Sequence, residues 1–226
     1  MSILPLKIDL HVHTSYSHDC LTSLDSVISF AQKRRLNGVS IADHDTIEGA
    51  LRLLEMAGTG LIIIPGIEVS TSQGHLLGIN VTTPIPRGLS IVETAARIHE
   101  AGGIAVAAHP SSPFKHAIGL DERLISYGVD AVETVNSTNF PFFLLNYLDK
   151  RLARRTGLPV TGGSDAHLPE AIGLGYTLID ETGTETDIDA VVQAIKRGRC
   201  VPIGRPMPWR LRLRKITLMS SKPPAH

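Results

Sequence analysis

The feature that most constrains this chain is a stretch near its start, residues 7–13 (KIDLHVH), in which apolar and polar residues alternate. Because successive side chains of a strand point to opposite faces, Asp9, His11 and His13 would share one face while the apolar residues share the other. Two imidazoles separated by one residue on a strand can bind one metal ion, with Asp9 placed to orient a ring. An isolated pair of this kind is equally explained by ordinary hydrogen bonding, so the rest of the chain has to decide.

Composition narrows the class of protein. The chain has 226 residues and a formal net charge of zero, which fits one α/β domain and argues against a broadly basic, nucleic-acid-coating surface. We expect a single domain over residues 1–204, followed by a basic tail (205–226) that is partly flexible and behaves as a solvated arm. Two cysteines, a start unlike a signal peptide and short apolar runs favour a soluble cytoplasmic protein that does not enter a membrane. The sequence indicates no oligomeric state.

The order of expected elements predicts an α/β fold. Short apolar strands alternate with amphipathic helical segments about seven times, which favours a distorted seven-stranded (β/α) barrel, similar to a TIM barrel, over an open sheet. The helix expected over 90–101 begins with a capping box formed by Ser90 and Glu93. The strand expected over 75–81 forms a hairpin with its predecessor. The expected strands are 7–13, 39–42, 61–69, 75–81, 104–108, 129–135, 159–162, 175–179 and 200–203, and the helices are 24–36, 47–57, 90–101, 121–126, 141–155 and 187–196.

Polar residues recur where these strands end. Histidines and carboxylates follow six of the expected strands, at His11 and His13, residues 43–45, Glu68, His109, Glu133 with Asn136, and residues 164–167. The carboxyl ends of barrel strands form one rim, and active sites of such barrels are built there. Histidines that served only to fill a core would be scattered along helices and loops instead. The sequence therefore predicts a metal site at this rim.

Six motifs carry a resemblance to a known family. They are residues 9–14 (DLHVHT), 16–19 (YSHD), 42–46 (ADHDT), 65–68 (PGIE), 108–110 (AHP) and 163–167 (GSDAH). In this order the chain resembles the PHP (polymerase and histidinol phosphatase) superfamily of metal-dependent phosphoesterases. The resemblance implies the PHP barrel fold, a hydrolase activity on phosphoric esters, and two or three bound divalent ions, which in the family are zinc, manganese or iron.

The resemblance also implies a ligand set. His11, His13 and Asp165 would hold one ion, and Glu68 would bridge it to a second ion held by His109. A third ion would be held by Asp19, His44 and His167. His75, which follows Glu68 at a variable spacing, is a further candidate ligand of the second ion, or else a hydrogen-bonded strand histidine.

Three residues are expected to act on the substrate: the bridging Glu68, Asp43 as a general acid, and Arg205 as a phosphate contact. Asp45 and His18 are alternatives to Asp43, and each could instead orient a ligand imidazole. Arg205 follows the last expected strand and should return to the rim. Lys115, in the polar loop after His109, is a second candidate phosphate contact or a solvated loop residue.

The expected function is hydrolysis of a phosphomonoester, on a small metabolite or a nucleotide, by water activated in a two- or three-metal site. The basic tail leaves two alternatives open: a nuclease that acts on nucleic-acid ends, and a non-catalytic PHP-like subunit that binds nucleic acid. The complete ligand set favours an enzyme, because a scaffold has no reason to keep so many costly polar residues together.

Overall fold

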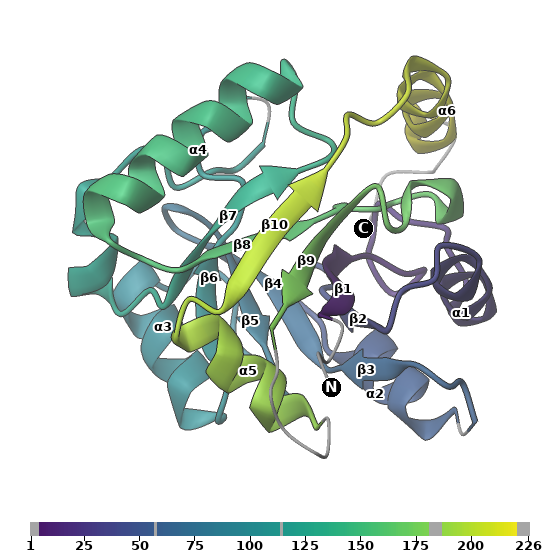
Figure 1. The fold of residues 1–226 in the computed structure, drawn as a ribbon, viewed down its shortest axis with the longest axis horizontal. Coiled ribbons are helices and arrows are strands. Elements are labelled where there is room, and N and C mark those ends of the chain that lie inside the picture. Colours follow the sequence, from purple (N-terminus) through teal and green to yellow (C-terminus); the bar gives the residue numbers. More distant parts are fainter. Residues whose placement is uncertain (1–4, 57, 114, 181–186, 221–226) are drawn as a thin grey trace.

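The computed structural model describes residues 5–56, 58–113, 115–180 and 187–220 (Figure 1). Its elements follow the predicted alternation of strands and helices. In chain order they are β1 (Leu6–Val12), α1 (Leu24–Lys33), β2 (Gly38–Ile41), α2 (Glu48–Glu55), β3 (Ile62–Ile64), β4 (Gly66–Thr71), β5 (Gly74–Ile79), α3 (Ile91–Glu100), β6 (Ile104–Ala107), the 3₁₀ turn η1 (Glu122–Tyr127), β7 (Ala131–Asn136), α4 (Phe142–Thr156), β8 (Val160–Gly163), η2 (Pro169–Ala171), β9 (Gly175–Ile179), α5 (Ile188–Lys196), β10 (Cys200–Gly204) and α6 (Trp209–Ser220).

The described strands form two sheets of five. One has the order β10-β9-β1-β2-β3, in which β1, β2 and β3 are parallel to one another and β9 is antiparallel to both of its neighbours, β1 and β10. The other has the order β4-β5-β6-β7-β8, with an antiparallel β4–β5–β6 segment followed by parallel β7 and β8. The sheets meet at single bridges, Val12 with Ala166 and His44 with Glu68, both beside the carboxyl ends of strands. The two seams therefore converge on one small region.

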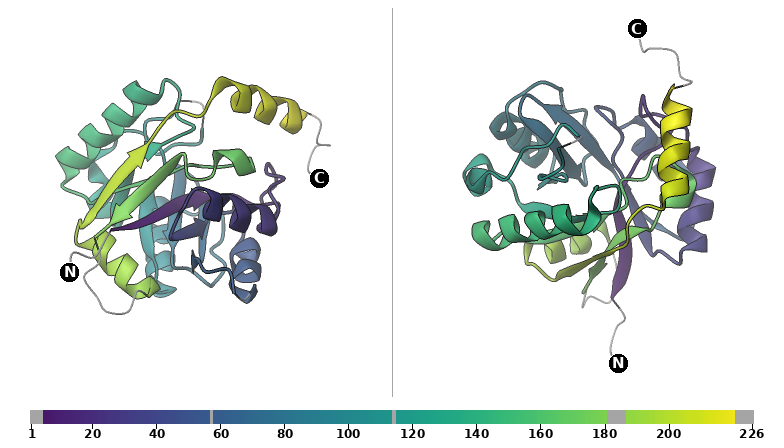
Figure 2. Two further views of the ribbon diagram at one scale, coloured as in Figure 1. Left: turned by 45° about the vertical axis from the view of Figure 1, so that its right-hand side comes forward. Right: turned by 90° about the horizontal axis from the view of Figure 1, so that it is seen from above.

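The α/β class is confirmed, but the predicted closed barrel of seven strands is wrong in detail. The described residues form ten strands in two open sheets (Figure 2). Two antiparallel strand pairs, the β4–β5 hairpin and the β9–β10 pair that α5 connects, account for the difference. The first part of β1, from Leu6 to Ile8, is already paired with β9, so β8 reaches β1 only near its end, through Val12. A ladder between β1 and β8 that would close a ring cannot form along an edge that β9 occupies.

Packing follows the expected amphipathic faces. Helices α1, α2, α3 and α5 each bury an apolar stripe, for example Val27 and Ala31 of α1, and three hydrophobic clusters fill the space between helices and sheets. The capping box of α3 is present, with the Ser90 hydroxyl accepting from the Glu93 amide. Cys20 and Cys200 are buried thiols that form no disulfide. No helix in the described part of the chain has the length and apolarity needed to cross a bilayer.

The predicted solvated arm is wrong for residues 209–220, which form α6 above η2 and α1 (Figures 1 and 2). Leu211 of α6 is buried against the cluster that contains Ala171 and Ile172. Arg212 is also not solvated as predicted, since its guanidinium donates to the backbone oxygens of Thr138 (2.9 Å) and Asn139 (3.1 Å). The chain after β10 is thus packed against the domain, and residues 221–226 lie outside the described part.

Candidate metal centre

The two seams bring nine of the predicted site residues to one place. Four lie in strands or directly after them on the first sheet's side, and the others come from β4, β5 and the loops after β6 and β8. The histidine rings form a continuous group of contacts, with centroid distances such as 5.0 Å between His11 and His13 and 4.1 Å between His13 and His167. The residues are His11, His13, Asp19, His44, Glu68, His75, His109, Asp165 and His167, and most are buried.

The donor atoms of His11, His13, Glu68 and Asp165 are arranged as ligands of one ion would be. The Nε2 atoms of the two histidines are 3.1 Å apart, and each lies 3.3 Å from Oε2 of Glu68. Oδ1 of Asp165 lies 3.4 Å from His13 and 3.9 Å from His11. Four donors at tetrahedral positions about 2.1 Å from one ion would lie about 3.4 Å from one another. The residues predicted for the first ion therefore fit a metal without rearrangement.

Glu68 presents its two oxygens to two different groups of histidines. Oε2 faces His11 and His13, and also lies 3.1 Å from Nδ1 of His44. Oε1 lies 3.0 Å from Nδ1 of His75 and 3.0 Å from Nε2 of His109. A carboxylate that bridges two ions needs this division of its oxygens. His75, whose role the sequence left open, thus lies beside Glu68 together with His109.

Asp19, His44 and His167 form the third predicted group. Oδ2 of Asp19 is 2.8 Å from Nε2 of His167 and 3.8 Å from Nε2 of His44, while Oδ1 is buried without a hydrogen-bond partner in the described structure. The groups are not separate, however. Donor atoms of His13, His44 and His167 lie within 4.8 Å of one another, and so do those of His44, Glu68 and His75. The geometry therefore forms a continuous multi-metal cluster, in which His44 lies between two groups.

The buried carboxylates of the site favour positive charge on the groups around them. Burial opposes protonation of His11, but the carboxylates of Glu133, Glu68 and Asp165 outweigh it and hold its pKa well above its usual range. The same competition, dominated by Asp165 and Glu68, raises the pKa of His13 to about 9. His44 shows the opposite result, because burial, reinforced by His13 and only partly offset by Glu68, lowers its pKa to about 3. Protons on two imidazoles therefore neutralise carboxylates that metal ions would otherwise neutralise.

A second layer of polar residues fixes the ligand rings. Glu133 accepts from Nδ1 of His11 (3.0 Å) through one oxygen and from the backbone amide of His109 (2.9 Å) through the other. The hydroxyl of Ser17 lies 3.1 Å from Nδ1 of His13. The sequence had placed Glu133 at a strand end but had assigned this orienting role to Asp9. Asp9 instead accepts backbone amides, those of Ser164 (2.9 Å) and Gly173 (2.8 Å) among them.

Backbone geometry at the site is also specialised. His109 and Asp165 have positive φ angles of 29° and 53°, in the left-handed region that residues other than glycine rarely adopt. A Cβ on Gly163 would lie only 2.4 Å from Cβ of His11, so only glycine allows β8 to approach β1 this closely. Such strained positions cluster at functional sites, because the surrounding structure has to hold them in place.

Comparisons with known proteins agree with this geometry. A family model described as PHP-associated (PHP_C) matches residues 144–200. An uncharacterized protein of Methanocaldococcus jannaschii, MJ1587, is 34% identical over 143 residues, which are 58% of this chain and 82% of that protein. The chain belongs to the PHP superfamily.

Two further matches describe the range of this superfamily. A two-domain Bacteroides vulgatus protein that contains a predicted PHP-like metal-dependent phosphoesterase superposes with a TM-score of 0.72 at 16% identity, over 95% of this chain and 69% of that one, a likeness of fold. The 5′-3′ exoribonuclease Rnm of Escherichia coli is 35% identical over 85 residues, which are 34% of this chain and 29% of the exoribonuclease. The chain thus spans under a third of that enzyme.

The predicted general acid Asp43 lies behind the ligands of the PHP site rather than at its exposed side. Asp43 is fully buried behind the ligands, where its oxygens accept from the Thr14 amide and hydroxyl (both 2.6 Å) and from Ser17 (3.0 Å). Asp45 is similarly occupied, by the amide and hydroxyl of Ser70. Neither carboxylate can reach a substrate while it holds these bonds. Of the three predicted candidates only His18 is exposed, with its ring 5.3 Å from that of His44.

Two lysines bring positive charge to the PHP cluster. Lys115 donates to the carboxylate of Asp165 and to the side chains of Asn136 (3.3 Å) and Thr138 (2.5 Å). Lys215 of α6 was not predicted as a site residue. Burial lowers its pKa, and it is close enough to Asp165 and Lys115 for their charges to act on it. The spacing of Leu211, Lys215 and Leu218 on one helical face was the available signal, but the tail had been taken for an arm.

Among the hydrogen bonds and ion pairs of the described residues, none joins the predicted phosphate contact Arg205 to a ligand of the PHP cluster. The backbone amide of Arg205 donates to the carbonyl oxygen of Leu174 (2.9 Å), and its side chain lines a surface pocket together with Lys7 at the start of β1. Lys7 is separated from His11, the first ligand, by about 13 Å along β1 at 3.3 Å per residue. The last strand, β10, is antiparallel to β9 and therefore runs in the same direction as β1, so Arg205 follows its carboxyl end.

Proposed function

We propose that this PHP protein is a metal-dependent phosphoric ester hydrolase, which uses water to hydrolyse a phosphomonoester on a small metabolite or a nucleotide. The single observation that carries the proposal is the division of the Glu68 oxygens between His11 with His13 and His75 with His109. A core histidine cluster would have no use for a buried carboxylate shared in this way. Residues that hold two ions side by side are typical of enzymes that hydrolyse phosphate esters.

The donor set decides which ions are suitable. Imidazole nitrogens mixed with carboxylate oxygens favour zinc, manganese or iron over calcium or magnesium. We assign His11, His13, Asp165 and Glu68 to one ion, Glu68, His75 and His109 to a second, and Asp19, His44 and His167 to a third. When bound, two such ions supply a nucleophilic water at neutral pH and neutralise charge on the phosphoryl group.

The chain's own residues have separate tasks in this proposal. Lys115 and Lys215 bind the substrate phosphate, because Lys115 pairs with Asp165 and the charges of both residues act on Lys215. A metal ion on Asp165 would compete with Lys115 for that carboxylate and so release the lysine toward the substrate. Glu133 and Ser17 hold the rings of His11 and His13 in the orientation that ligation needs. His18, exposed beside His44, is placed to donate a proton to the leaving oxygen.

A second candidate function is hydrolysis at the end of a nucleic acid. Relatives named 5′-3′ exoribonucleases, from Escherichia coli, Salmonella typhimurium and Haemophilus influenzae, favour it, although each matches only part of its length. The chemistry at phosphorus would be the same, with a nucleotide as the leaving group. A non-catalytic binding subunit is less well supported, because such a protein would not need nine converging ligands.

The deciding experiment combines metal analysis with activity. Protein reconstituted with zinc, manganese or iron should bind two to three ions per chain and hydrolyse phosphomonoesters or short oligonucleotides. Glu68→Gln keeps the shape of the side chain but removes the bridging charge, so kcat should fall by at least about a thousandfold while the circular dichroism spectrum is unchanged. Glu48→Gln, an exposed change on α2, is the matched control. Fewer than one ion per chain, or an active Glu68→Gln variant, would refute the proposal.

A further inference from the structure

A second concave site lies beside β1, with Lys7 at the amino end of that strand. It is a pocket of about 420 Å³ between the start of β1, the end of α1 and the turn that follows β10. Five of the side chains that line it are cationic, and Tyr176 of β9 contributes an aromatic ring. The cations are Lys7, Lys33, Arg34, Arg35 and Arg205.

These cations lack acidic partners. Among the residues that the structure describes, no Asp or Glu forms an ion pair with any of the five. Lys7 donates instead to the backbone oxygen of Arg34 (3.0 Å) and lies 4.3 Å from the centroid of the Tyr176 ring, while Arg34 donates to the backbone oxygen of Glu170 (3.1 Å). Burial and the adjacent charge of Arg34 lower the pKa of Lys7, an effect that the carboxylate of Asp9 only partly offsets. The pocket therefore carries an excess of positive charge, which an anion would stabilise.

The end of α1 explains only part of this charge. Lys33 and Arg34 lie at a helix C-terminus, where cations interact favourably with the helix dipole. Lys7 belongs to a strand, however, and Arg205 follows β10, so neither gains from that dipole. Arg35 has a φ angle of 53°, which turns the chain sharply after the helix. Cations contributed by three separate parts of the chain converge here.

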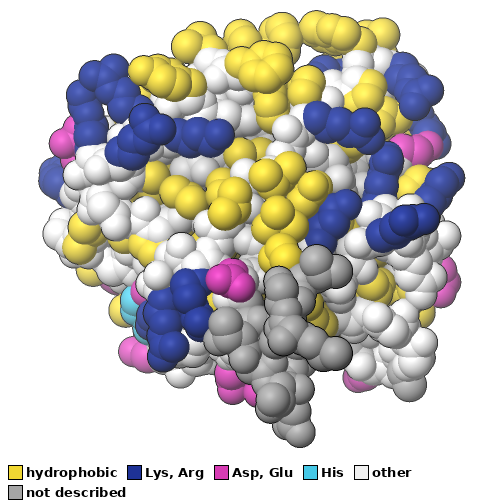
Figure 3. All heavy atoms as spheres, viewed as in Figure 1, with side chains coloured by type: hydrophobic (Ala, Val, Ile, Leu, Met, Phe, Trp, Pro, Cys, Tyr) yellow, Lys and Arg dark blue, Asp and Glu magenta, His cyan; other side chains and the backbone are white. Residues whose placement is uncertain are grey.

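The pocket connects to the metal cluster along the surface. Glu170 of η2 links the two regions, because its backbone oxygen accepts from Arg34 and its carboxylate pairs with Arg214 of α6. The residue after Arg214 is Lys215, which is close enough to Asp165 and Asp19 of the cluster for their charges to act on it. Figure 3 shows Lys and Arg side chains gathered over α6 and α1 on this side of the molecule. Positive charge thus continues from the pocket toward the metal site.

We infer that this pocket binds backbone phosphates of a single-stranded nucleic acid whose reactive end lies in the metal cluster, an inference that rests on the proposed function. Lys7 and His11 are about 13 Å apart along β1, a distance that is too long for one nucleotide but suits an oligonucleotide. The pocket volume of about 420 Å³ accommodates about one nucleotide. Oligonucleotides therefore occupy both sites, and small phosphomonoesters occupy the metal cluster alone.

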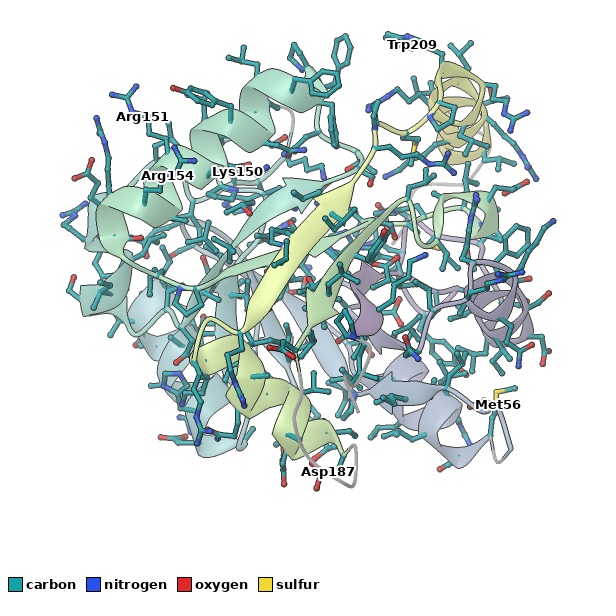
Figure 4. All side chains as sticks on the ribbon, viewed as in Figure 1. Met56, Lys150, Arg151, Arg154, Asp187 and Trp209 are labelled. Atoms are coloured by element: carbon teal, nitrogen blue, oxygen red, sulfur yellow. The ribbon has the colours of Figure 1, made fainter. Side chains whose placement is uncertain are left out.

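The test measures binding of a 5′-phosphorylated, fluorescently labelled phosphorothioate decanucleotide to the metal-loaded protein by anisotropy. Lys33→Glu with Arg35→Glu should weaken binding at least tenfold and reduce the slope of log K against log salt by about 1.4, since two phosphate contacts are lost from a single strand. The double variant Lys150→Glu with Arg151→Glu makes the same charge change on α4, on the far side of β10 from α1 (Figure 4), and should bind within twofold of wild type.

A second double variant, with milder substitutions, controls for misfolding. Lys33→Gln with Arg35→Asn removes the charges, and asparagine tolerates the positive φ at position 35. It should weaken binding severalfold with an unchanged melting temperature. The inference is overturned if either pocket variant binds like wild type, if the α4 control weakens binding equally, or if the wild type binds phosphatidylserine vesicles and no oligonucleotide.

The same proteins assayed with p-nitrophenyl phosphate separate this inference from the proposed function. If wild type hydrolyses this small ester and the pocket variants bind the decanucleotide normally, the pocket inference fails and the hydrolase stands. If the pocket variants lose oligonucleotide binding but no metal-loaded protein hydrolyses any ester, the hydrolase fails and the pocket stands.

Discussion

The two ends of β1 differ in how their charged side chains are neutralised. At its carboxyl end, His11 and His13 are fully buried, and each pairs with a carboxylate, His11 with Glu133 and His13 with Asp165. At its amino end, Lys7 belongs to a group of five cations with no carboxylate partner among the described residues. Burial forces the first arrangement, since an unpaired charge out of water costs several kcal/mol. Solvent permits the second, and an anionic ligand that arrives from solution would neutralise it.

Metal removal should have the largest effect and should act on one end only. Dialysis against a chelator should abolish hydrolysis and lower the melting temperature by on the order of 10 °C, because ions at a thousandfold excess over Kd stabilise the folded state by about 4 kcal/mol. Calorimetric scans with and without metal measure this shift. The double substitution Lys33→Glu with Arg35→Glu should weaken oligonucleotide binding by the same factor in the metal-loaded protein and in the protein treated with chelator. A factor that vanishes with the metal would mean that the two ends are not independent.

Replacing Lys215 should have an intermediate effect and would show that α6 belongs to the carboxyl-end site. Lys215→Ala should lower kcat/KM for a small phosphomonoester about ten- to a hundredfold, since a hydrogen bond to an ionised group contributes about 1.5–3 kcal/mol. Lys115→Ala should act in the same way. Arg210→Ala, an exposed change on the same helix, is the charge-matched control. Steady-state kinetics in which Lys215→Ala equals this control would remove α6 from the site.

Arg205→Ala should have the smallest effect and decides between the sequence-based role and the observed position. The sequence predicts a loss of ten- to a hundredfold on every substrate, as for a phosphate contact at the metal site. The structure predicts a kcat/KM for p-nitrophenyl phosphate within about twofold of wild type, and a salt slope for oligonucleotide binding that is smaller by about 0.7. Kinetics and anisotropy on one preparation measure both. A uniform loss would place Arg205 with the metal cluster after all.

The sequence by itself determined the local structure and the list of candidate ligands. Residues 7–13 alternate with a period of two, which placed His11 and His13 on one face of β1. Helices α1 to α5 follow from apolar residues that recur with a period near 3.6 residues. The N-terminal cap of α3 follows from Ser90 and Glu93. These features depend on backbone geometry over a few residues, so they can be predicted without the rest of the molecule. The family resemblance added the grouping of ligands around Glu68.

Only the tertiary structure decided which of the polar residues near those ligands do what. Asp43 and Glu133 both follow strands in the sequence, yet Asp43 is enclosed by Thr14 and Ser17 while Glu133 orients His11. Lys215 comes close enough to Asp165 for their charges to interact because α6 folds back over η2, and Arg205 lines a surface pocket together with Lys7. Strand order, sheet closure and the path of the last helix are set by contacts between residues far apart in the chain. A local pattern carries no information about such contacts, because their energy exists only once the distant segments meet.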